Sequence, residues 1–554
     1  MTSSSEKKQG LPMPAAIYSK QEVDMWTMMN SAIAKSGAVN LGQGFMNFAP
    51  EKFVMEAGAK CILDEKCQQY APVRGCKRML DALAVRYSKL LGREINPNTE
   101  IMTASGGNEA IFDAIAGFIE KEYRNEVILI DPAFDQYHAN IFMIGGTSKR
   151  VSMKLNPDLD PENNSIPASE FKLDLDELEA AITERTRLLI ITTPHNPTGK
   201  VLTQEELEGI AAIAIKHDLL VISDEVYFSL YYDGTEHRSI STIPGMWERT
   251  VVAGALGKLF GVTGWRIGWL VGPEHLISAA IHSHVQVVFT SPTPLMEAAG
   301  LALEYAETST FYEDQRKKYV SCRKKLMDIL DSVGLPYIIP QGSYFLLLNV
   351  GKVKIPDDFE IPQFFRDNGR CFMLAYFFAT EIGIGSIPST YFYAKENRHL
   401  SENYLRLAFC KTDETFEAAR ILDLALTKVP TTGWTQTSVA LACEELGLSL
   451  MSHKVSENGG MGLIKHFFDK SLASLDSAAS TPEFLENHDI KERVKYLSTF
   501  RIKQTTPYVN KWQEYVRKKL FWSDCLPICI FLFHLGRRNP HAPRKYACSP
   551  IFAI

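Results

Sequence analysis

The chain has 554 residues, 45% of them hydrophobic and 22% charged, which is the composition of a globular enzyme with length for two or more domains. It carries 59 Lys and Arg against 65 Asp and Glu, a net charge of -6, and no sustained basic stripe. A nucleic-acid partner is therefore not expected. The longest notable apolar run, residues 525–535, is too short to span a bilayer, so no membrane association is expected either.

The cysteines and the N-terminus indicate the compartment. The ten cysteines are irregularly spaced, as expected for reduced thiols in a reducing environment. The first ten residues are polar, without the apolar segment of a signal peptide or the arginines of a transit peptide. These features favour the cytoplasm over the mitochondrion.

Short apolar segments alternate with helical periods from about Val127 onward. Strands are predicted at residues 126–131, 187–192, 219–223 and 250–254, and a helix at 203–216 opens with the capping box Thr203-x-x-Glu206. Continuous Val, Ile and Leu strands separated by helices predict an α/β fold with a mostly parallel sheet covered on both faces. Ligands bind beyond the carboxyl ends of such strands, where Asn196, Asp224 and Lys258 are expected to meet.

A smaller unit is expected to follow the large one. A charged helix at 312–333 leads to a strand at 340–349. The predicted organisation is an N-terminal arm with part of the small domain (1–55), a large cofactor domain (56–310), the rest of an α+β small domain (311–429) and an extension of unassigned role (430–554). In that extension Cys525, Cys529, His534 and His541 offer zinc ligands. Their irregular spacing and the apolar residues between them argue against it, so no metal is predicted.

Lys258 is the most informative residue because of the motifs that stand around it. Those motifs are Asn196-Pro-Thr-Gly199, Asp224-Glu-Val-Tyr227, Gly257-Lys258, Thr263-Gly-Trp-Arg266 and Tyr404-Leu-Arg406. Alone, each has an ordinary structural explanation, such as an exposed lysine, a capping aspartate or a plain turn. Together they supply an amine, a carboxylate, a phenol, an amide and cations, which pyridoxal 5'-phosphate (PLP) needs at once.

Each residue type has a defined role toward this cofactor. The Lys258 amine can hold the aldehyde covalently and, once released, move a proton from the substrate Cα. The Asp224 carboxylate keeps the pyridine nitrogen protonated, while Tyr227 and Asn196 bond the phenolic oxygen. Arg266 and the turn with Gly107 and Asn108, at a predicted helix N-terminus, should hold the phosphate.

Arg406 should bind the substrate α-carboxylate through a bidentate fork. Such a fork also fixes rotation about Cα, so that the Cα–H bond stands perpendicular to the ring and breaks first. This selects transamination over decarboxylation. A surface arginine on a strand is the structural alternative.

The order and spacing of these motifs resemble fold-type I, class I/II aminotransferases, within them the kynurenine and glutamine transaminase branch, over roughly residues 20 to 428. The resemblance implies that Phe134 stacks on the cofactor ring and that the Gly44 backbone approaches the substrate carboxylate. It implies that Tyr70 reaches the phosphate of a neighbouring subunit, hence a homodimer with shared sites. Trp26, Phe289 and Tyr344 are candidates for an aromatic side-chain pocket, or equally for the core.

The expected function is that of a PLP-dependent aminotransferase with ping-pong kinetics. An amino acid, kynurenine or another aromatic or glutamine-like one, would give its amine to PLP, and a 2-oxo acid would take it up. Two other hypotheses stay open on the sequence: β-elimination from cysteine S-conjugates at the same site, and a PLP-binding or regulatory module without turnover. Measuring the formation of 2-oxo acid with and without an amino acceptor would separate amino transfer from β-elimination.

The chain departs from the family pattern at two places. Ala255 stands three residues before Lys258, where the family has a serine that bonds the phosphate, and Leu259 stands where a threonine is common. The run Phe45-Met46-Asn47-Phe48 replaces Phe-Pro-Asp-Phe, so this loop should be less rigid.

The first departure gives a test. Restoring the hydroxyl with Ala255→Ser should add one charge-assisted hydrogen bond, which tightens PLP binding by about 1.5–3 kcal/mol. The measurement is the PLP dissociation constant of the two apoproteins. An unchanged constant would contradict the prediction.

Overall fold

The computed structural model describes residues 24–332, 334–357, 359–413 and 415–416, with residues 441, 467, 496–500, 503–504 and 508. Contacts divide the chain into two compact units, Met1–Thr412 and Asp413–Ile554. In the second unit Phe467 is buried, and its ring meets that of Tyr508 edge-on with 4.9 Å between centroids. The four zinc candidates lie outside the described residues. The domain boundaries proposed from the sequence stay predictions.

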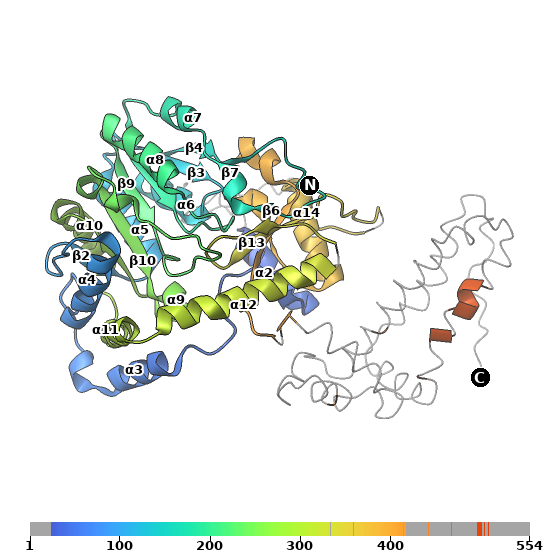
Figure 1. Cartoon of the computed structure of the whole chain (residues 1–554), viewed down its shortest axis with the longest axis horizontal. Helices are drawn as coiled ribbons and strands as arrows, with labels where there is room; N and C mark the ends of the chain where they lie inside the picture. Colours follow the sequence, from blue (N-terminus) through green and yellow to red (C-terminus); the bar gives the residue numbers. More distant parts are fainter. Residues whose placement is uncertain are drawn as a thin grey trace, which may run out of the picture. The chain divides into compact units, whose positions relative to one another are not determined.

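A seven-stranded sheet forms the centre of the first unit (Figure 1). In spatial order its strands are β2 (Ile101–Ala104), β11 (Gly268–Val271), β10 (Thr250–Ala255), β9 (Leu220–Asp224), β8 (Thr186–Thr192), β3 (Glu126–Asp131) and β4 (Thr147–Ser152). Neighbours are parallel except where β11 pairs with β10 and β2. The predicted strands and the mostly parallel α/β sheet are confirmed.

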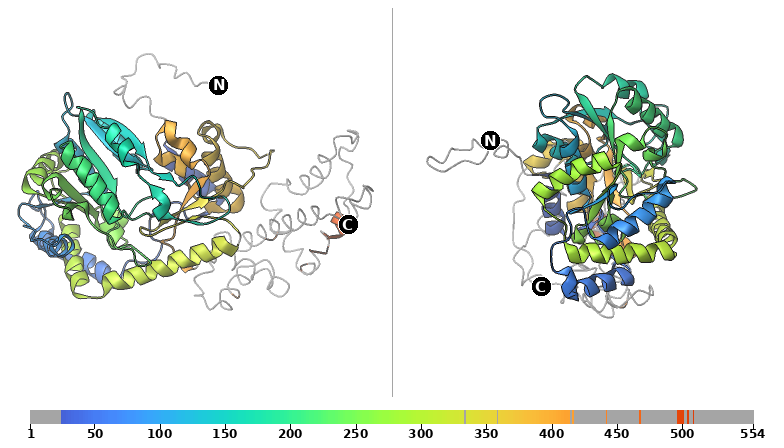
Figure 2. Two further views of the ribbon diagram at one scale, coloured as in Figure 1. Left: turned by 45° about the horizontal axis from the view of Figure 1, so that its top comes forward. Right: turned by 90° about the vertical axis from the view of Figure 1, so that its left-hand side faces the viewer.

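Helices cover both faces of this sheet (Figure 2). Leu129 packs with α5 (Gly107–Phe118) and α10 (Glu274–Val287), whereas the preceding Ile128 packs with α8 (Gln204–Lys216) on the opposite face. This alternation explains why the strands are apolar throughout. The other helices of this part are α3 (Lys52–Leu63), α4 (Lys77–Leu91), α6 (Asp135–Ile144), α7 (Leu175–Ala180), α9 (Leu256–Leu259), α11 (Thr293–Thr308) and α12 (Phe311–Ser332).

Helix α8 begins as predicted. The Thr203 hydroxyl accepts from the Glu206 N–H at 3.2 Å, and the Glu206 carboxylate accepts from the Thr203 N–H at 2.9 Å. This capping box satisfies two N–H groups that a helix start would otherwise leave unpaired. None of the helices in the described ranges is long and apolar enough to cross a membrane.

A smaller group of strands and helices completes the first unit. Its elements are α2 (Met25–Ser36), β1 (Val39–Asn40), β13 (Phe345–Asn349), α13 (Gln363–Asp367), α14 (Arg370–Phe377), β14 (Ile384–Gly385), β15 (Ile387–Pro388) and β16 (Tyr404–Ala408). Strand β16 lies between β13 and β15, antiparallel to both, and β1 pairs with β14. Both views show the long α12 extending from the large-sheet part toward these strands (Figures 1 and 2).

The strand predicted at 340–349 forms only in its second half, as β13. The N–H groups of Gln341 and Gly342 both donate to the Gly199 carbonyl at 2.8 Å, and Ser343 has a φ of 58°. These residues therefore fasten the loop after Asn196, and Gly342 forms only an isolated bridge with Tyr231 and does not extend β13. The sequence-based prediction was wrong there because this partner lies far away in the chain.

Candidate active site

A cavity of about 300 Å³ opens at the carboxyl ends of the parallel strands, where the sequence placed the site. Most of the predicted site residues line it: Trp26, Gly44, Gly107, Asn108, Phe134, Asn196, Asp224, Tyr227, Lys258, Arg266 and Arg406. They come from segments that lie far apart in sequence. The fold therefore brings together the amine, the carboxylate, the phenol, the amide and the two guanidinium groups.

Lys258 reaches this cavity from the short helix α9, directly after β10. Its neighbours Leu256 and Leu259 are buried in the core, so the helix turns Lys258 toward the cavity. The Lys258 Nζ donates to the Gly44 carbonyl at 3.3 Å. Burial lowers the pKa of this amine from an ordinary 10.5 to about 8, and Arg406 and Arg266 act in the same direction. A larger neutral fraction near neutral pH makes it a better nucleophile.

Asp224 is the last residue of β9 and points into the same cavity. One of its carboxylate oxygens accepts from the Val226 N–H at 3.2 Å, which turns the chain away from the sheet. The other accepts a short hydrogen bond from the Tyr137 hydroxyl. Burial raises the pKa of Asp224, although the bonds from Tyr137 and Val226 and the charge of Lys258 oppose this.

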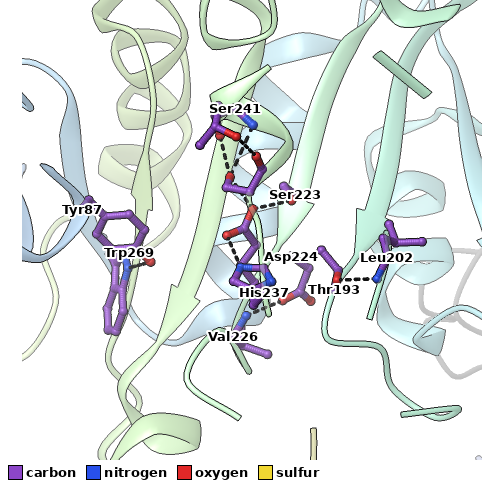
Figure 3. A network of polar contacts seen from close by, with 12 residues as sticks. Tyr87, Thr193, Leu202, Ser223, Asp224, Val226, His237, Ser241 and Trp269 are labelled. Atoms are coloured by element: carbon purple, nitrogen blue, oxygen red, sulfur yellow. Dashed lines mark hydrogen bonds and ion pairs between the residues drawn. The ribbon is translucent and has the colours of Figure 1, made fainter. Parts of the chain in front are cut away.

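The turn after Asp224 is anchored by a second buried carboxylate (Figure 3). Glu225 accepts from the Ser223 hydroxyl at 2.8 Å, the Ser239 hydroxyl at 2.6 Å and the His237 Nε2 at 2.9 Å. Hydrogen bonds from these three donors offset the cost of burying the Glu225 carboxylate, and they fix the backbone on both sides of Asp224. Tyr227, fully buried two residues later, has a raised pKa because of burial.

Gly106, Gly107, Ala255 and Arg266 form a narrow cradle at the N-terminus of α5. A Cβ on Gly106, whose φ is 102°, would stand 2.6 Å from the Arg266 Nη2, and one on Gly107 would stand 3.2 Å from the Ala255 Cβ. Only glycines leave room there for a group beside the guanidinium. A helix N-terminus and a guanidinium suit a phosphate, so the cradle fits the PLP phosphate group.

Arg406 lies at the other end of the cavity on the central strand β16. It is 2% exposed, and burial lowers its pKa to about 10. Its Nη1 donates to the Asn196 Oδ1 at 2.9 Å and its Nη2 to the Gly42 carbonyl at 2.8 Å, while its buried Nε has no hydrogen-bond partner among the described residues. A buried guanidinium held only by neutral acceptors fits a carboxylate ligand.

The loop with Gly44 is fastened to the chain beyond β16. The buried Lys411 Nζ donates to the Gln43 carbonyl at 3.1 Å and to the Phe45 carbonyl at 2.8 Å, and the Thr412 N–H donates to the Asn47 Oδ1 at 2.8 Å. The loop that lacks the family's proline is thus held by long-range bonds. A Cβ on Gly44 would stand 2.5 Å from the Phe345 ring, so the close approach requires glycine.

Three predicted aromatic residues do not line the cavity of this chain. Tyr344 lies behind it, where its hydroxyl donates to the Gly44 carbonyl at 2.8 Å and its ring meets Tyr227 edge-on. The rings of Tyr70 and Phe289 pack edge-on, with 5.2 Å between their centroids. Both residues lie on the surface of the chain, where Tyr70 is 81% exposed and Phe289 47% exposed. Their roles stay predictions.

Tyr137 and Phe345 line the cavity, but sequence reasoning gave them no role. The ring centroid of Phe345 lies 4.2 Å from the Cζ of the Arg406 guanidinium. Tyr137 is the donor to Asp224 across 87 positions. The available signal was the run 131–137 after β3, in which Phe134 and Tyr137 stand one helical turn apart.

Comparison with known proteins identifies the family. The family model "Aminotransferase class I and II" matches residues 36–421. The kynurenine–oxoglutarate transaminase of Dictyostelium discoideum is 39% identical over 402 residues, covering 71% of this chain and 92% of the relative. Human kynurenine–oxoglutarate transaminase 1 is 35% identical, covering 71% of this chain and 93% of the relative.

Solved structures lead to the same family. The Saccharomyces cerevisiae protein Bna3p is 36% identical with a TM-score of 0.70, covering 74% of this chain and 97% of that protein. The N-succinyldiaminopimelate aminotransferase of Mycobacterium tuberculosis is 29% identical with a TM-score of 0.64, covering 73% and 97%. By its family match, its relatives and its fold, this chain belongs to the class I and II aminotransferases.

Proposed function

We propose that the chain binds PLP at Lys258 and transfers the amino group of an aromatic or glutamine-like amino acid, kynurenine among them, to a 2-oxo acid. The observation that supports this most directly is the cavity itself, where a Lys258 amine of lowered pKa, the Asp224 carboxylate and two cations converge. The relatives named above are transaminases, which favours amino transfer over β-elimination or a role without turnover.

The roles of the residues follow from their positions. When bound, PLP draws electrons away from the substrate Cα. Asp224, held by Tyr137, would pair with the ring nitrogen, and the glycine cradle with Arg266 would hold the phosphate. Arg406 would orient the substrate carboxylate, and the neutral Lys258 amine would take up the Cα proton and return it.

An aromatic side chain is favoured by the rings around Arg406. Trp26, Phe345 and Phe392 lie 5.6, 4.2 and 4.9 Å from the Arg406 guanidinium, measured to the ring centroids. A substrate whose carboxylate meets Arg406 would place its side chain near the two rings that line the cavity, Trp26 and Phe345.

The central test is covalent labelling at Lys258. Borohydride reduction of the PLP-loaded protein should add the cofactor mass to the peptide with Lys258, and Lys258→Ala should abolish it. Lys411, also buried near the cavity, is the internal control and should stay unlabelled. Labelling at Lys411, or none at Lys258, would refute the proposed attachment.

The pKa of Lys258 predicts the pH dependence of this attachment. Only the neutral amine attacks the aldehyde, so the rate at which the apoprotein takes up PLP should rise with pH and level off above about 8. Stopped-flow absorbance measures this rate. A rate that still climbs toward pH 10 would show that burial leaves the amine with its ordinary pKa.

Arg406→Lys should impair substrate binding but not cofactor binding. A lysine cannot reproduce the fork, so kcat/KM for the amino acid should fall roughly 10- to 100-fold, about 1.5–3 kcal/mol. Arg370→Lys is the matched control, because Arg370 also donates to neutral acceptors but lies outside the cavity. Equal losses in both variants would contradict the assigned role.

We also propose a homodimer whose sites are completed by the partner subunit. The exposed rings of Tyr70 and Phe289 support it, since large aromatic rings exposed together mark contact surfaces. In a dimer with twofold symmetry, each subunit would make the same contact with the active site of its partner.

Mixing two impaired variants tests the shared sites. Tyr70→Ala and Lys258→Ala should each be weak alone, yet after re-pairing a mixed dimer has one site with both residues intact. Random pairing should restore about a quarter of wild-type activity. Tyr123→Ala, which alters another exposed tyrosine, should stay active by itself. No recovery on mixing would contradict the arrangement.

A further inference from the structure

Three ionisable side chains meet beside the glycine cradle in the interface between α5 and α10. Glu109 and Asp113 stand one turn apart on α5, and His284 faces them from the last turn of α10. Their ligating atoms all lie within 4.8 Å of one another, and the side chains of Asp113 and His284 are fully buried. The proposed reaction uses none of them, so they need another explanation.

Glu109 connects this cluster to the cradle. One of its carboxylate oxygens accepts from the Ser105 N–H at 2.6 Å, and Ser105 directly precedes Gly106. The other accepts from the His284 ring at 2.8 Å. Because a carboxylate only accepts, the His284 Nδ1 must carry the proton. His284 thus positions the Glu109 carboxylate, and this carboxylate in turn positions Ser105 at the start of the turn.

The charge of Glu109 is offset by His284, while burial raises the pKa of Asp113 to about 7. Burial favours neutral forms throughout, yet hydrogen bonds from His284 and others hold the pKa of Glu109 below its ordinary value. Burial likewise opposes the charge on His284, but its bonds to Asp113 and Glu109 raise its pKa to about 9. At neutral pH a cationic imidazole therefore sits against the Glu109 anion, which would otherwise repel a phosphate next door.

We propose that His284 is a positioning residue for the cofactor phosphate: through its hydrogen bond to Glu109 it fixes the backbone at Ser105, where the cradle begins. This inference rests on the proposed function. It has a particular use in this chain, because Ala255 supplies no hydroxyl to the phosphate. The turn and Arg266 must then hold that group, and the turn depends on its anchor.

The same three side chains would also suit a metal ion, since two carboxylates and an imidazole are common ligands. The geometry favours the hydrogen-bonded arrangement. Glu109 uses both oxygens for N–H donors, and its 2.8 Å separation from the His284 Nδ1 is a direct hydrogen-bond length. Metal content is therefore included in the test as an outcome that would overturn the proposal.

The experiment compares variants at one position in the full chain. His284→Asn keeps a donor where Nδ1 lies, His284→Gln moves it to where Nε2 lies, and His284→Leu removes it. We expect the PLP dissociation constant to rise about tenfold or more in the Leu and Gln variants and to stay within about threefold in Asn. The KM for the amino acid, measured with saturating PLP, should change little, since Arg406 is untouched.

Asp113→Asn is the matched control. It removes an acidic group that contacts His284 but leaves the Glu109 hydrogen bonds to the His284 ring and the Ser105 N–H in place, so it should change the PLP dissociation constant much less than His284→Leu does. If the Leu variant does not fold, the comparison of Asn with Gln still decides. Equal weakening by Asn and Leu, or an unchanged constant in Leu and Gln, would overturn the proposal. A stoichiometric metal in the wild-type protein that Asp113→Asn loses would also overturn it.

The two proposals fail separately. If borohydride labels Lys258 in the wild type and in His284→Leu at the same PLP concentration dependence, only the role of His284 is refuted. If Lys258 is never labelled, the cofactor site itself is refuted.

Discussion

Positive charge without a matching anion is the constraint on which this site depends: Arg406 is buried, Lys258 half-buried and Arg266 exposed. Lys258, Arg266 and Arg406 all face one cavity, and in the described part of the chain their side chains donate to neutral oxygens and none forms an ion pair with a carboxylate. Asp224 is the acid that faces the same space, and Tyr137 holds it. A protein keeps such an arrangement when a ligand brings the missing negative charge. A phosphate at one end and a carboxylate at the other would supply it.

The fold places these groups by simple means. Parallel strands deliver Asp224 and Lys258 at one edge of the sheet, since Asp224 sits opposite Ala253 in the register of β9 and β10. The central strand β16 carries Arg406 between Leu347 and Ile387, so that its backbone is held by strands on both sides. The Arg406 end of the cavity is therefore positioned by the strands of the core.

Much of this was predictable from sequence because it is local. Apolar runs predicted the strands, and a polar residue after each run predicted the edge where Asn196, Asp224 and Lys258 meet. What could not be predicted depends on distant partners. Tyr137 donates across 87 positions, Gln341 is drawn out of a strand by Gly199, and His284 reaches Glu109 from 175 positions away. No periodic pattern encodes such pairs, which exist only after the sheet has packed.

The fastening of the Gly44 loop has a consequence for how the chain can be divided. The ladder of β16 ends at Ala408, but the atoms that hold the loop belong to Lys411 and Thr412. The carbonyl of Gly44 that meets Lys258 belongs to that same loop. A catalytic fragment trimmed to the last residue of the sheet would keep the strands and lose the clamp. A fragment that keeps the clamp must therefore extend at least through Thr412, the last residue of the first unit.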